Sequence, residues 1–269
     1  MKTLLKNARI LSMRDDNITR GDVVILDNKI IYVGQDSDKF APFDIVREIN
    51  GNLLMPSFKN AHTHSAMTFL RSKTDDFNLQ DWLFKVVIPR EDFLTEEDVY
   101  AFSKVAFLEY LTTGVSACFD QYYFPLSTGK AAKEMGMRCV LLGTYNSLYS
   151  KEDIKNLYHQ INDEDGLVKY YFGIHAEYTC PDSELKIMNE VIHEKKAPFF
   201  THISETEKEV KECYERRGMS PVQFLASQGL YDFGGGGYHC CHFDEKDIKI
   251  FRNCGLSVVT CPGSNTKLA

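Results

Sequence analysis

The pattern of apolar residues along the chain changes at about residue 52. Before that point, short runs rich in β-branched residues are separated by turns, at 4–11, 23–26 and 30–33. Runs of this length, with Asp-Asn at 27–28 as a turn, are typical of β-strands. We therefore expect a small β-sheet module over residues 1–51.

Beyond residue 52, apolar runs alternate with long amphipathic stretches. Seven apolar runs predict strands, at 53–58, 115–119, 138–142, 170–175, 198–202, 238–241 and 256–260. Helical periodicity marks stretches between them, at 96–111, 127–135, 184–194, 205–217 and 244–253. A strand followed by a helix, repeated along the chain, indicates a parallel sheet, and a (β/α)8 TIM-type barrel explains it best. A doubly wound sheet is the alternative, but no GxGxxG motif follows the first strand.

Composition and charge exclude several classes of function. The chain has 269 residues and a net charge of −7, from 31 basic and 38 acidic residues with no basic stripe, so we expect no nucleic acid partner. It contains neither a signal peptide nor eighteen consecutive apolar residues, so we expect no membrane partner. Eight cysteines lack CxxC pairs and are too sparse for a disulfide scaffold. We predict reduced thiols in a cytoplasmic protein.

Two histidines one residue apart give the first sign of chemistry. His62 and His64 follow the first predicted barrel strand. In an extended strand, residues i and i+2 point to the same face, whereas a helix would place them about 200° apart. Two imidazoles on one face can bind one metal ion. Such a pair is weak evidence by itself, because two close histidines often arise by chance.

The barrel prediction strengthens the metal hypothesis, because active sites of such barrels lie at the carboxyl ends of the strands. Five histidines fall at or near predicted strand ends: His62, His64, His175, His202 and His239. One buried histidine is usually explained by a hydrogen bond, but five at strand ends are better explained by a common site. We expect no role for His159, His193 and His242.

Ordered motifs along nearly the whole chain carry a family resemblance. They are Met-Pro at 55–56, NAHTH at 60–64, MTFLR at 67–71, WLF at 82–84, IPRED at 88–92, GIH at 173–175, THISET at 201–206, YHC at 238–240 and PGSNTKL at 262–268. The chain resembles the amidohydrolase superfamily. Within it, the similarity is to the branch of 5′-methylthioadenosine/S-adenosylhomocysteine deaminases and related aminohydrolases and chlorohydrolases.

The resemblance implies a mononuclear metal site. It assigns His62, His64 and His202 as ligands of one divalent ion, Zn²⁺ with Fe²⁺ as the alternative. Three neutral imidazoles with water in an open position also suit a catalytic zinc site. The resemblance places His239 beside the attacking water, as a catalytic residue.

The resemblance makes Glu205 the group that moves protons between water and a ring nitrogen of the substrate. The residues alone offer a second interpretation, because Ser-Glu-Thr-Glu at 204–207 resembles a capping box that opens a helix. Both can hold if Ser204 and Glu207 cap the helix while Glu205 faces the metal.

Substrate contacts are expected from Trp82, Glu91, His175 and Glu205. The resemblance implies that His175 contacts the heterocycle of the substrate and that Glu91 contacts a ribose hydroxyl. From sequence alone, Glu91 is as readily a solvated acid before a helix. Trp82 and Phe84 would line the pocket, although aromatic residues at this spacing more often serve packing.

Two rival metal chemistries fit less well. Hydantoinase-like relatives bridge two metals with a modified lysine at the end of the fourth strand, where this chain has His175. The other zinc deaminases carry HxE followed by PCxxC. His175-Ala176-Glu177 resembles the first half of that signature, but the second half is missing.

The expected reaction is hydrolytic deamination of an amino-heterocycle by metal-bound hydroxide, with release of ammonia. The small-molecule substrate would be an adenosine-type nucleoside such as methylthioadenosine, S-adenosylhomocysteine or adenosine. Guanine deaminase, or a related aminohydrolase or chlorohydrolase, is the alternative. Ile174 and Glu177 stand where we would expect proline, which leaves the substrate open. A homo-oligomer also remains open.

The resemblance also implies more chain than these 269 residues. Relatives continue through an eighth strand that ends in a metal-binding aspartate, and then complete a β-sandwich with the amino-terminal module. We therefore expect an incomplete sandwich over 1–51 and a barrel over 52–269 that lacks its last strand. An inactive truncated fragment is the competing hypothesis. The four glycines at 234–237 are expected to form a mobile entry to His239.

Overall fold

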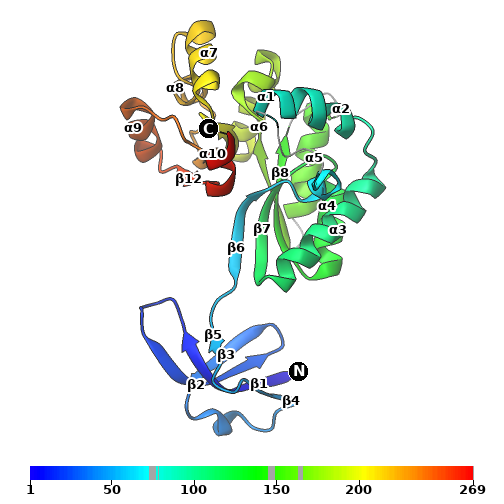
Figure 1. The fold of residues 1–269 in the computed structure, drawn as a ribbon, viewed down its shortest axis with the longest axis vertical. Helices are drawn as coiled ribbons and strands as arrows, with labels where there is room; N and C mark the ends of the chain where they lie inside the picture. The colour runs from blue at the N-terminus through cyan, green and yellow to red at the C-terminus, as the bar shows by residue number, and fades with distance from the viewer. Residues whose placement is uncertain (73–76, 78, 145–148, 163–165, 269) are drawn as a thin grey trace. The chain divides into compact units, whose positions relative to one another are not determined.

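The computed structural model describes residues 1–72, 77, 79–144, 149–162 and 166–268. The chain divides into two compact units, Met1–Phe58 and Lys59–Ala269 (Figure 1). No helix among the described residues is both long and apolar enough to cross a bilayer.

The first unit is a five-stranded β-sheet. Its strands are β1 (Lys2–Leu11), β2 (Ile18–Leu26), β3 (Lys29–Gly34), β4 (Ile45–Glu48) and β5 (Leu53–Leu54). Strand β1 pairs antiparallel with β2 and parallel with β4 and β5, and β3 pairs antiparallel with β2. A small core of Ala8, Ile10 and Val23 packs on one face. The predicted β-rich runs are therefore strands of one sheet.

The second unit has the architecture of a TIM-type barrel. Its described strands, in chain order, are β6 (Phe58–Thr63), β7 (Val115–Gln121), β8 (Arg138–Thr144), β9 (Val168–Gly173), β10 (Phe199–Ile203), β11 (Gly235–His239) and β12 (Ser257–Val259). Their order in the sheet follows the chain, and the pairs from β7 to β12 are parallel. This strand order confirms the predicted fold class.

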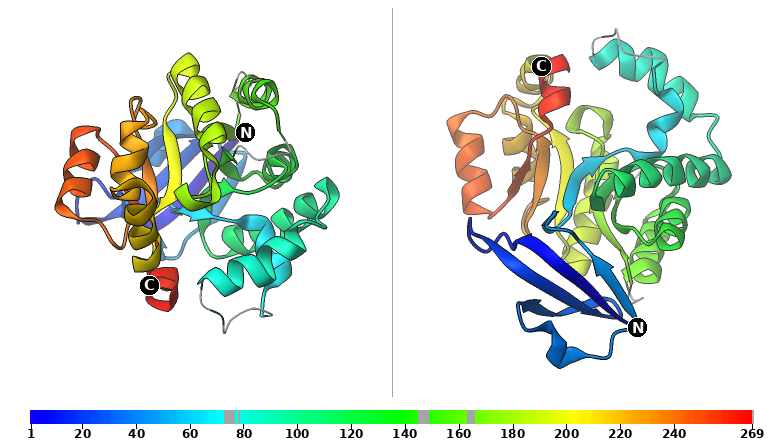
Figure 2. Two further views of the ribbon diagram at one scale, coloured as in Figure 1. Left: turned by 90° about the horizontal axis from the view of Figure 1, so that it is seen from above. Right: turned by 60° about the horizontal axis from the view of Figure 1, so that its bottom comes forward.

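Helices connect the strands and lie outside the sheet (Figure 2). The longer ones are α3 (Glu96–Thr112), α4 (Pro125–Met135), α5 (Lys151–Asn162), α6 (Asp182–Lys195), α7 (Glu207–Arg217), α8 (Pro221–Ser227), α9 (Glu245–Asn253) and α10 (Pro262–Leu268). Short helical segments lie between β6 and α3: η2 (Ser65–Leu70), α1 (Leu79–Asp81), η3 (Trp82–Val87) and α2 (Ile88–Glu91). Helix α3 begins at a side-chain cap, because the hydroxyl of Thr95 accepts from the amide of Asp98.

Two layers of apolar side chains hold the second unit together. Between sheet and helices, the core includes Phe107, Met137, Leu141 and Met188. Aromatic rings also meet across strands, with the ring centroid of Phe119 4.8 Å from that of Phe200 and 6.0 Å from that of Tyr238. Burial of these large side chains fixes the positions of the strand ends that carry the histidines.

The first barrel strand lies further along the chain than predicted. Residues 53–58 were expected to form it, but Leu53–Leu54 pairs with β1 in the first unit, and the barrel strand is β6, Phe58–Thr63. Pro56 separates the two short strands, because proline lacks the amide proton needed for continuous pairing. His62 is therefore inside β6, and His64 follows it directly.

The prediction that the glycines at 234–237 form a mobile entry to His239 is wrong. Gly235–His239 is strand β11, which pairs with β10 and β12. A Cβ atom at Gly235 would lie 1.9 Å from the carbonyl oxygen of Phe199, and one at Gly236 would lie 2.3 Å from that of Ser257. The glycines are thus required by the close approach of neighbouring strands.

Candidate metal and substrate site

The second unit brings five histidine rings together, each from a different predicted strand end except for the pair on β6. The ring centroid of His62 lies 4.8 Å from that of His64, 4.7 Å from His202 and 5.8 Å from His239. The ring of His175 lies 4.8 Å from that of His202. The predicted convergence of these histidines on one site is therefore present in the fold.

His64 and His202 are held as neutral rings. The Nδ1 atom of His64 lies 2.7 Å from the carbonyl oxygen of Gln121, and that of His202 lies 2.7 Å from the carbonyl oxygen of His175. A carbonyl oxygen only accepts, so each Nδ1 carries the proton and each Nε2 keeps a lone pair. Burial lowers the pKa of both rings, which favours this neutral form.

The two lone pairs face each other. The Nε2 atoms of His64 and His202 are 3.3 Å apart, a contact that is repulsive between two acceptors unless a cation lies between or beside them. Backbone carbonyls behind metal-binding histidines are the usual means of fixing the tautomer and the ring orientation. This donor set therefore fits a divalent metal ion.

His62 and His239 complete the candidate donor set. Nitrogen atoms of His62, His202 and His239 lie within 4.8 Å of one another. The ring of His62 stacks on Tyr238 with the ring centroids 3.8 Å apart, and its buried Nδ1 has no hydrogen-bond partner among the described residues. A buried nitrogen without a partner is costly, and metal binding would satisfy it. The ligand set His62, His64 and His202 remains a prediction, with His239 at the same centre.

Glu205 lies beside this cluster in the turn that follows β10. Its carboxylate is 6% exposed, and its Oε1 atom is 3.5 Å from Nδ1 of His239. Burial raises the pKa of Glu205 to about 7. A carboxylate whose protonated and ionised forms are close in free energy near neutral pH suits proton transfer.

The turn that carries Glu205 is fixed by Glu209, a residue that the sequence did not single out. The buried Glu209 carboxylate accepts the backbone amides of Ser204 and Glu205, both at 2.8 Å. The helix cap is Thr206, whose hydroxyl accepts from the Glu209 amide. The predicted capping box of Ser204 and Glu207 is therefore wrong, because α7 begins two residues later than that box requires.

Two further positioning contacts were also missed. Asn265 Oδ1 lies 2.8 Å from Nδ1 of His239, across 26 residues of sequence. The side-chain amide of Gln121 donates to the carbonyl of Ile174, so the end of β7 is tied to the loop that carries His175. Asn265 falls in the PGSN motif, which gave a signal, whereas Gln121 and Glu209 had none.

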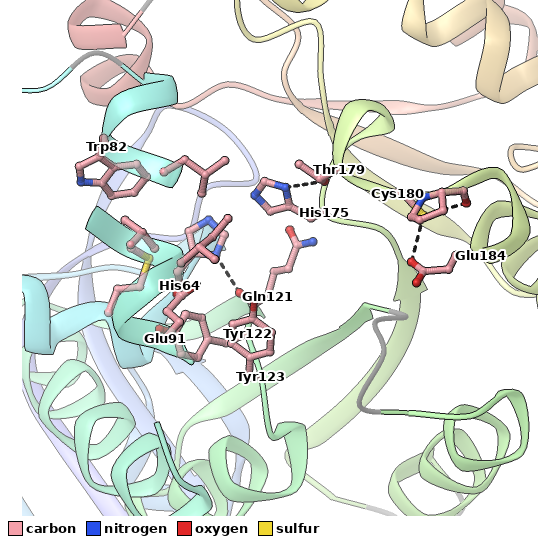
Figure 3. A pocket seen from close by; sticks show the side chains of 15 residues that line it. His64, Trp82, Glu91, Gln121, Tyr122, Tyr123, His175, Thr179, Cys180 and Glu184 are labelled. Atoms are coloured by element: carbon pink, nitrogen blue, oxygen red, sulfur yellow. Dashed lines mark hydrogen bonds between the residues drawn. The ribbon is translucent and has the colours of Figure 1, made fainter. Parts of the chain in front are cut away.

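A cavity of about 400 Å³ opens from His64 (Figure 3). Apolar side chains form much of its wall: Met67, Leu83, Val87, Ile88 and Pro181. Polar and aromatic groups line the rest: Trp82, Glu91, Gln121, Tyr122, Tyr123, His175, Thr179, Cys180 and Glu184. The volume suits a nucleoside-sized ligand, and the mixture of apolar walls with few polar groups is typical of small-molecule sites.

The predicted substrate residues separate into those that line the cavity and those that do not. Trp82, Glu91 and His175 line it. Burial raises the pKa of Glu91, so this side chain is not the freely solvated acid of the competing interpretation. Phe84 is 50% exposed, and neither it nor Glu205 is among the described lining residues. The roles in substrate binding stay predictions.

The sequence model of the amidohydrolase family matches residues 53–269. A protein named 5-methylthioadenosine/S-adenosylhomocysteine deaminase, from Thermoanaerobacter pseudethanolicus, is 35% identical over 100% of this chain and 64% of its own length. A protein named 5′-deoxyadenosine deaminase, from Methanosarcina mazei, is 35% identical over 99% of this chain and 63% of its own length. The chain thus spans about 64% of the length of such relatives.

Solved structures agree on the fold. The crystal structure of an adenosine deaminase from Xanthomonas campestris with bound zinc has a TM-score of 0.85 and 26% identity, and covers 99% of this chain and 64% of that one. A guanine deaminase from C. acetobutylicum with bound guanine has a TM-score of 0.87 at 17% identity, over 100% of this chain and 69% of that one. The chain belongs to the amidohydrolase family.

Proposed function

We propose that this protein is a metal-dependent deaminase that hydrolyses the amino group of an adenosine-type nucleoside. The observation that carries the proposal is the pair of neutral imidazole nitrogens, His64 Nε2 and His202 Nε2, facing each other 3.3 Å apart at the end of a nucleoside-sized cavity. The names of the relatives, which include methylthioadenosine and deoxyadenosine deaminases, support the same class of substrate.

We propose His62, His64 and His202 as the residues that hold one divalent ion, Zn²⁺ or Fe²⁺. When bound, such an ion supplies a Lewis acid that lowers the pKa of water towards neutrality. The chain contributes the orientation of the rings, through the carbonyl oxygens of Gln121 and His175. Burial keeps these rings neutral and therefore able to bind.

Glu205 is proposed as the group that transfers protons. It would take a proton from the attacking water and deliver it to a ring nitrogen, while oxygen bonds to the carbon that bears the amino group. Loss of ammonia then leaves a carbonyl at that carbon, so that one water is consumed for each ammonia released. The pKa of about 7 for Glu205 suits both halves of this transfer. His239, 3.5 Å from Glu205, is proposed to orient the water.

The cavity is proposed to bind the nucleoside. The apolar wall that includes Leu83 and Val87, together with the Trp82 ring, can pack against a heterocycle and ribose. The Glu91 carboxylate can accept a hydrogen bond from a ribose hydroxyl, and His175 can bond to the heterocycle. This division of tasks accounts for a cavity that is apolar along one wall and polar elsewhere.

The test is ammonia release by the purified, zinc-loaded protein. The substrates to compare are methylthioadenosine, S-adenosylhomocysteine, 5′-deoxyadenosine, adenosine and guanine. We expect release from at least one adenosine-type nucleoside and none from guanine. Zinc binding without release of ammonia from any of them would refute the deaminase, and preferential turnover of guanine would support the alternative activity.

A further inference from the structure

A buried acid outside the metal cluster has an unusual set of partners. Glu177, in the 3-10 turn η4 (Glu177–Thr179) after β9, is 2% exposed. Its Oε2 accepts from Nη2 of Arg216 at 2.5 Å, and its Oε1 accepts from Nε of Arg217 at 3.1 Å. A buried carboxylate needs such charge partners, because a buried charge that loses its partner strongly destabilises the fold.

Arg217 also holds the far end of the same segment. Its Nη1 and Nη2 atoms donate to both oxygens of Asp182, at 3.0 and 2.5 Å, where α6 begins. The guanidinium carbon lies 4.3 Å from the centre of the Phe224 ring, which fixes its plane. A single guanidinium therefore binds both ends of the segment 177–182.

The segment between these two anchors forms one wall of the cavity. Thr179, Cys180 and Pro181 line it, and the Thr179 hydroxyl lies 2.9 Å from Nδ1 of His175. The same hydroxyl accepts from the amide of Ala176. The position of the segment thus determines both the shape of this wall and the orientation of the His175 ring (Figure 3).

We propose that Glu177, Asp182 and Arg217 form an ionic clasp that positions His175 and the wall of the cavity for substrate binding. The proposal rests on the proposed function, in which this cavity takes the nucleoside. Glu177 and Arg217 do not line the cavity, so they are positioning residues that act through Thr179 and His175. Glu177, which replaces an expected proline, is thereby explained as an anchor.

Steady-state kinetics of the zinc-loaded protein tests the clasp. In Arg217→Met we expect KM to rise about tenfold, with kcat within about twofold of wild type, because the metal end keeps its backbone anchors. Zinc stoichiometry should not change. Arg217→Lys keeps the charge but not the planar guanidinium that bonds to both carboxylates, so its KM should lie between those of wild type and Arg217→Met. The matched control is Lys208→Met, which breaks an exposed pair with Glu212 on the same helix and should leave KM unchanged.

A paired variant separates positioning from stability. Glu177→Leu with Arg217→Met replaces the buried carboxylate and its half-buried arginine by apolar groups, and replacing both partners of such a pair often leaves stability intact. We expect this double variant to unfold at the wild-type temperature and still to show a raised KM. A wild-type KM in the double variant would overturn the clasp.

Hydrogen exchange keeps the clasp testable if the deaminase proposal fails. In the zinc-loaded protein, amides of residues 175–182 should exchange about tenfold faster in Arg217→Met than in Lys208→Met, while those of β10 should not differ. Equal exchange at residues 175–182 would refute the clasp. Absence of ammonia release by wild type, with the difference in exchange present, would refute only the proposed function.

Discussion

The two ends of the candidate site hold their histidines by different means. At the proposed metal end, His64 bonds through Nδ1 to the carbonyl of Gln121, the last residue of β7, and His202 bonds through Nδ1 to the carbonyl of His175, two residues after β9. At the outer wall, His175 bonds to the hydroxyl of Thr179, whose turn is anchored by Glu177 and its arginines. Backbone carbonyls at or just after a barrel strand can shift only if the barrel shifts, whereas an ionic anchor is lost when one side chain is substituted. The positions of the histidines at the metal end therefore depend on the fold of the barrel. The position of His175 at the outer wall depends on a few side chains that single substitutions can change.

The largest expected effect is loss of the metal. His202→Ala removes one of the two facing imidazoles, and we expect zinc affinity to fall at least about 100-fold, with loss of turnover. Isothermal titration with zinc measures it. The control is His193→Ala, an exposed histidine that pairs with Asp232. Unchanged affinity in His202→Ala would show that the metal end is not built on this residue.

Substitution of Glu205, the proposed proton carrier, should separate catalysis from metal binding. Glu205→Gln keeps the shape but cannot ionise, so we expect kcat to fall about 10²–10⁴-fold with zinc affinity retained. The matched control is Glu207→Gln, an exposed acid at the start of α7. A Glu205→Gln variant with normal kcat would leave this carboxylate only a structural role.

An intermediate effect is expected at the outer wall. Glu91→Gln removes a charged acceptor from the cavity, and we expect KM for the nucleoside to rise about 10-fold while kcat changes little. The comparison of adenosine with 2′,3′-dideoxyadenosine sharpens the assignment. If Glu91 contacts the ribose hydroxyls, the variant should lose most of the preference for adenosine. An unchanged preference would place Glu91 elsewhere.

The smallest effect is expected for a partly exposed charge pair that is not among the described residues lining the cavity. Lys151→Met breaks the pair with Glu190 between α5 and α6. Exposed pairs contribute less than about 1 kcal/mol, so thermal unfolding should shift by a few degrees at most, and KM should stay at the wild-type value. A rise in KM as large as that of Arg217→Met would mean that any ion pair on these helices affects the cavity.

The sequence predicted those features that depend on neighbouring residues. The apolar runs located most strands to within a few residues, because burial on both faces of a parallel strand gives a continuous apolar signal. The i, i+2 spacing predicted that His62 and His64 lie together at a strand end, and their ring centroids are 4.8 Å apart although His64 follows β6. The error at residues 53–58 arose where two short strands, in different units, share one apolar run interrupted by Pro56.

The sequence could not predict features that depend on distant partners. Glu177 finds Arg216 and Arg217 39 and 40 residues away, and no local pattern encodes that meeting. The glycines at 234–237 suggested mobility, but Gly235 and Gly236 are required by the close approach of β10 and β12, which only the sheet reveals. The cap at Thr206 was misplaced because two overlapping Ser/Thr-to-Glu patterns, 204–207 and 206–209, compete over six residues.

Helix α7 has a consequence for how this protein can tolerate insertions. The turn with Glu205 precedes its first residue, and Arg216 and Arg217 form its last two positions. One residue inserted into the helix would rotate everything after it by about 100° and advance it about 1.5 Å. Glu205 would keep its place, while both guanidiniums would turn away from Glu177. The number of residues in α7 therefore sets the spacing between the turn with Glu205 and the two arginines that hold Glu177.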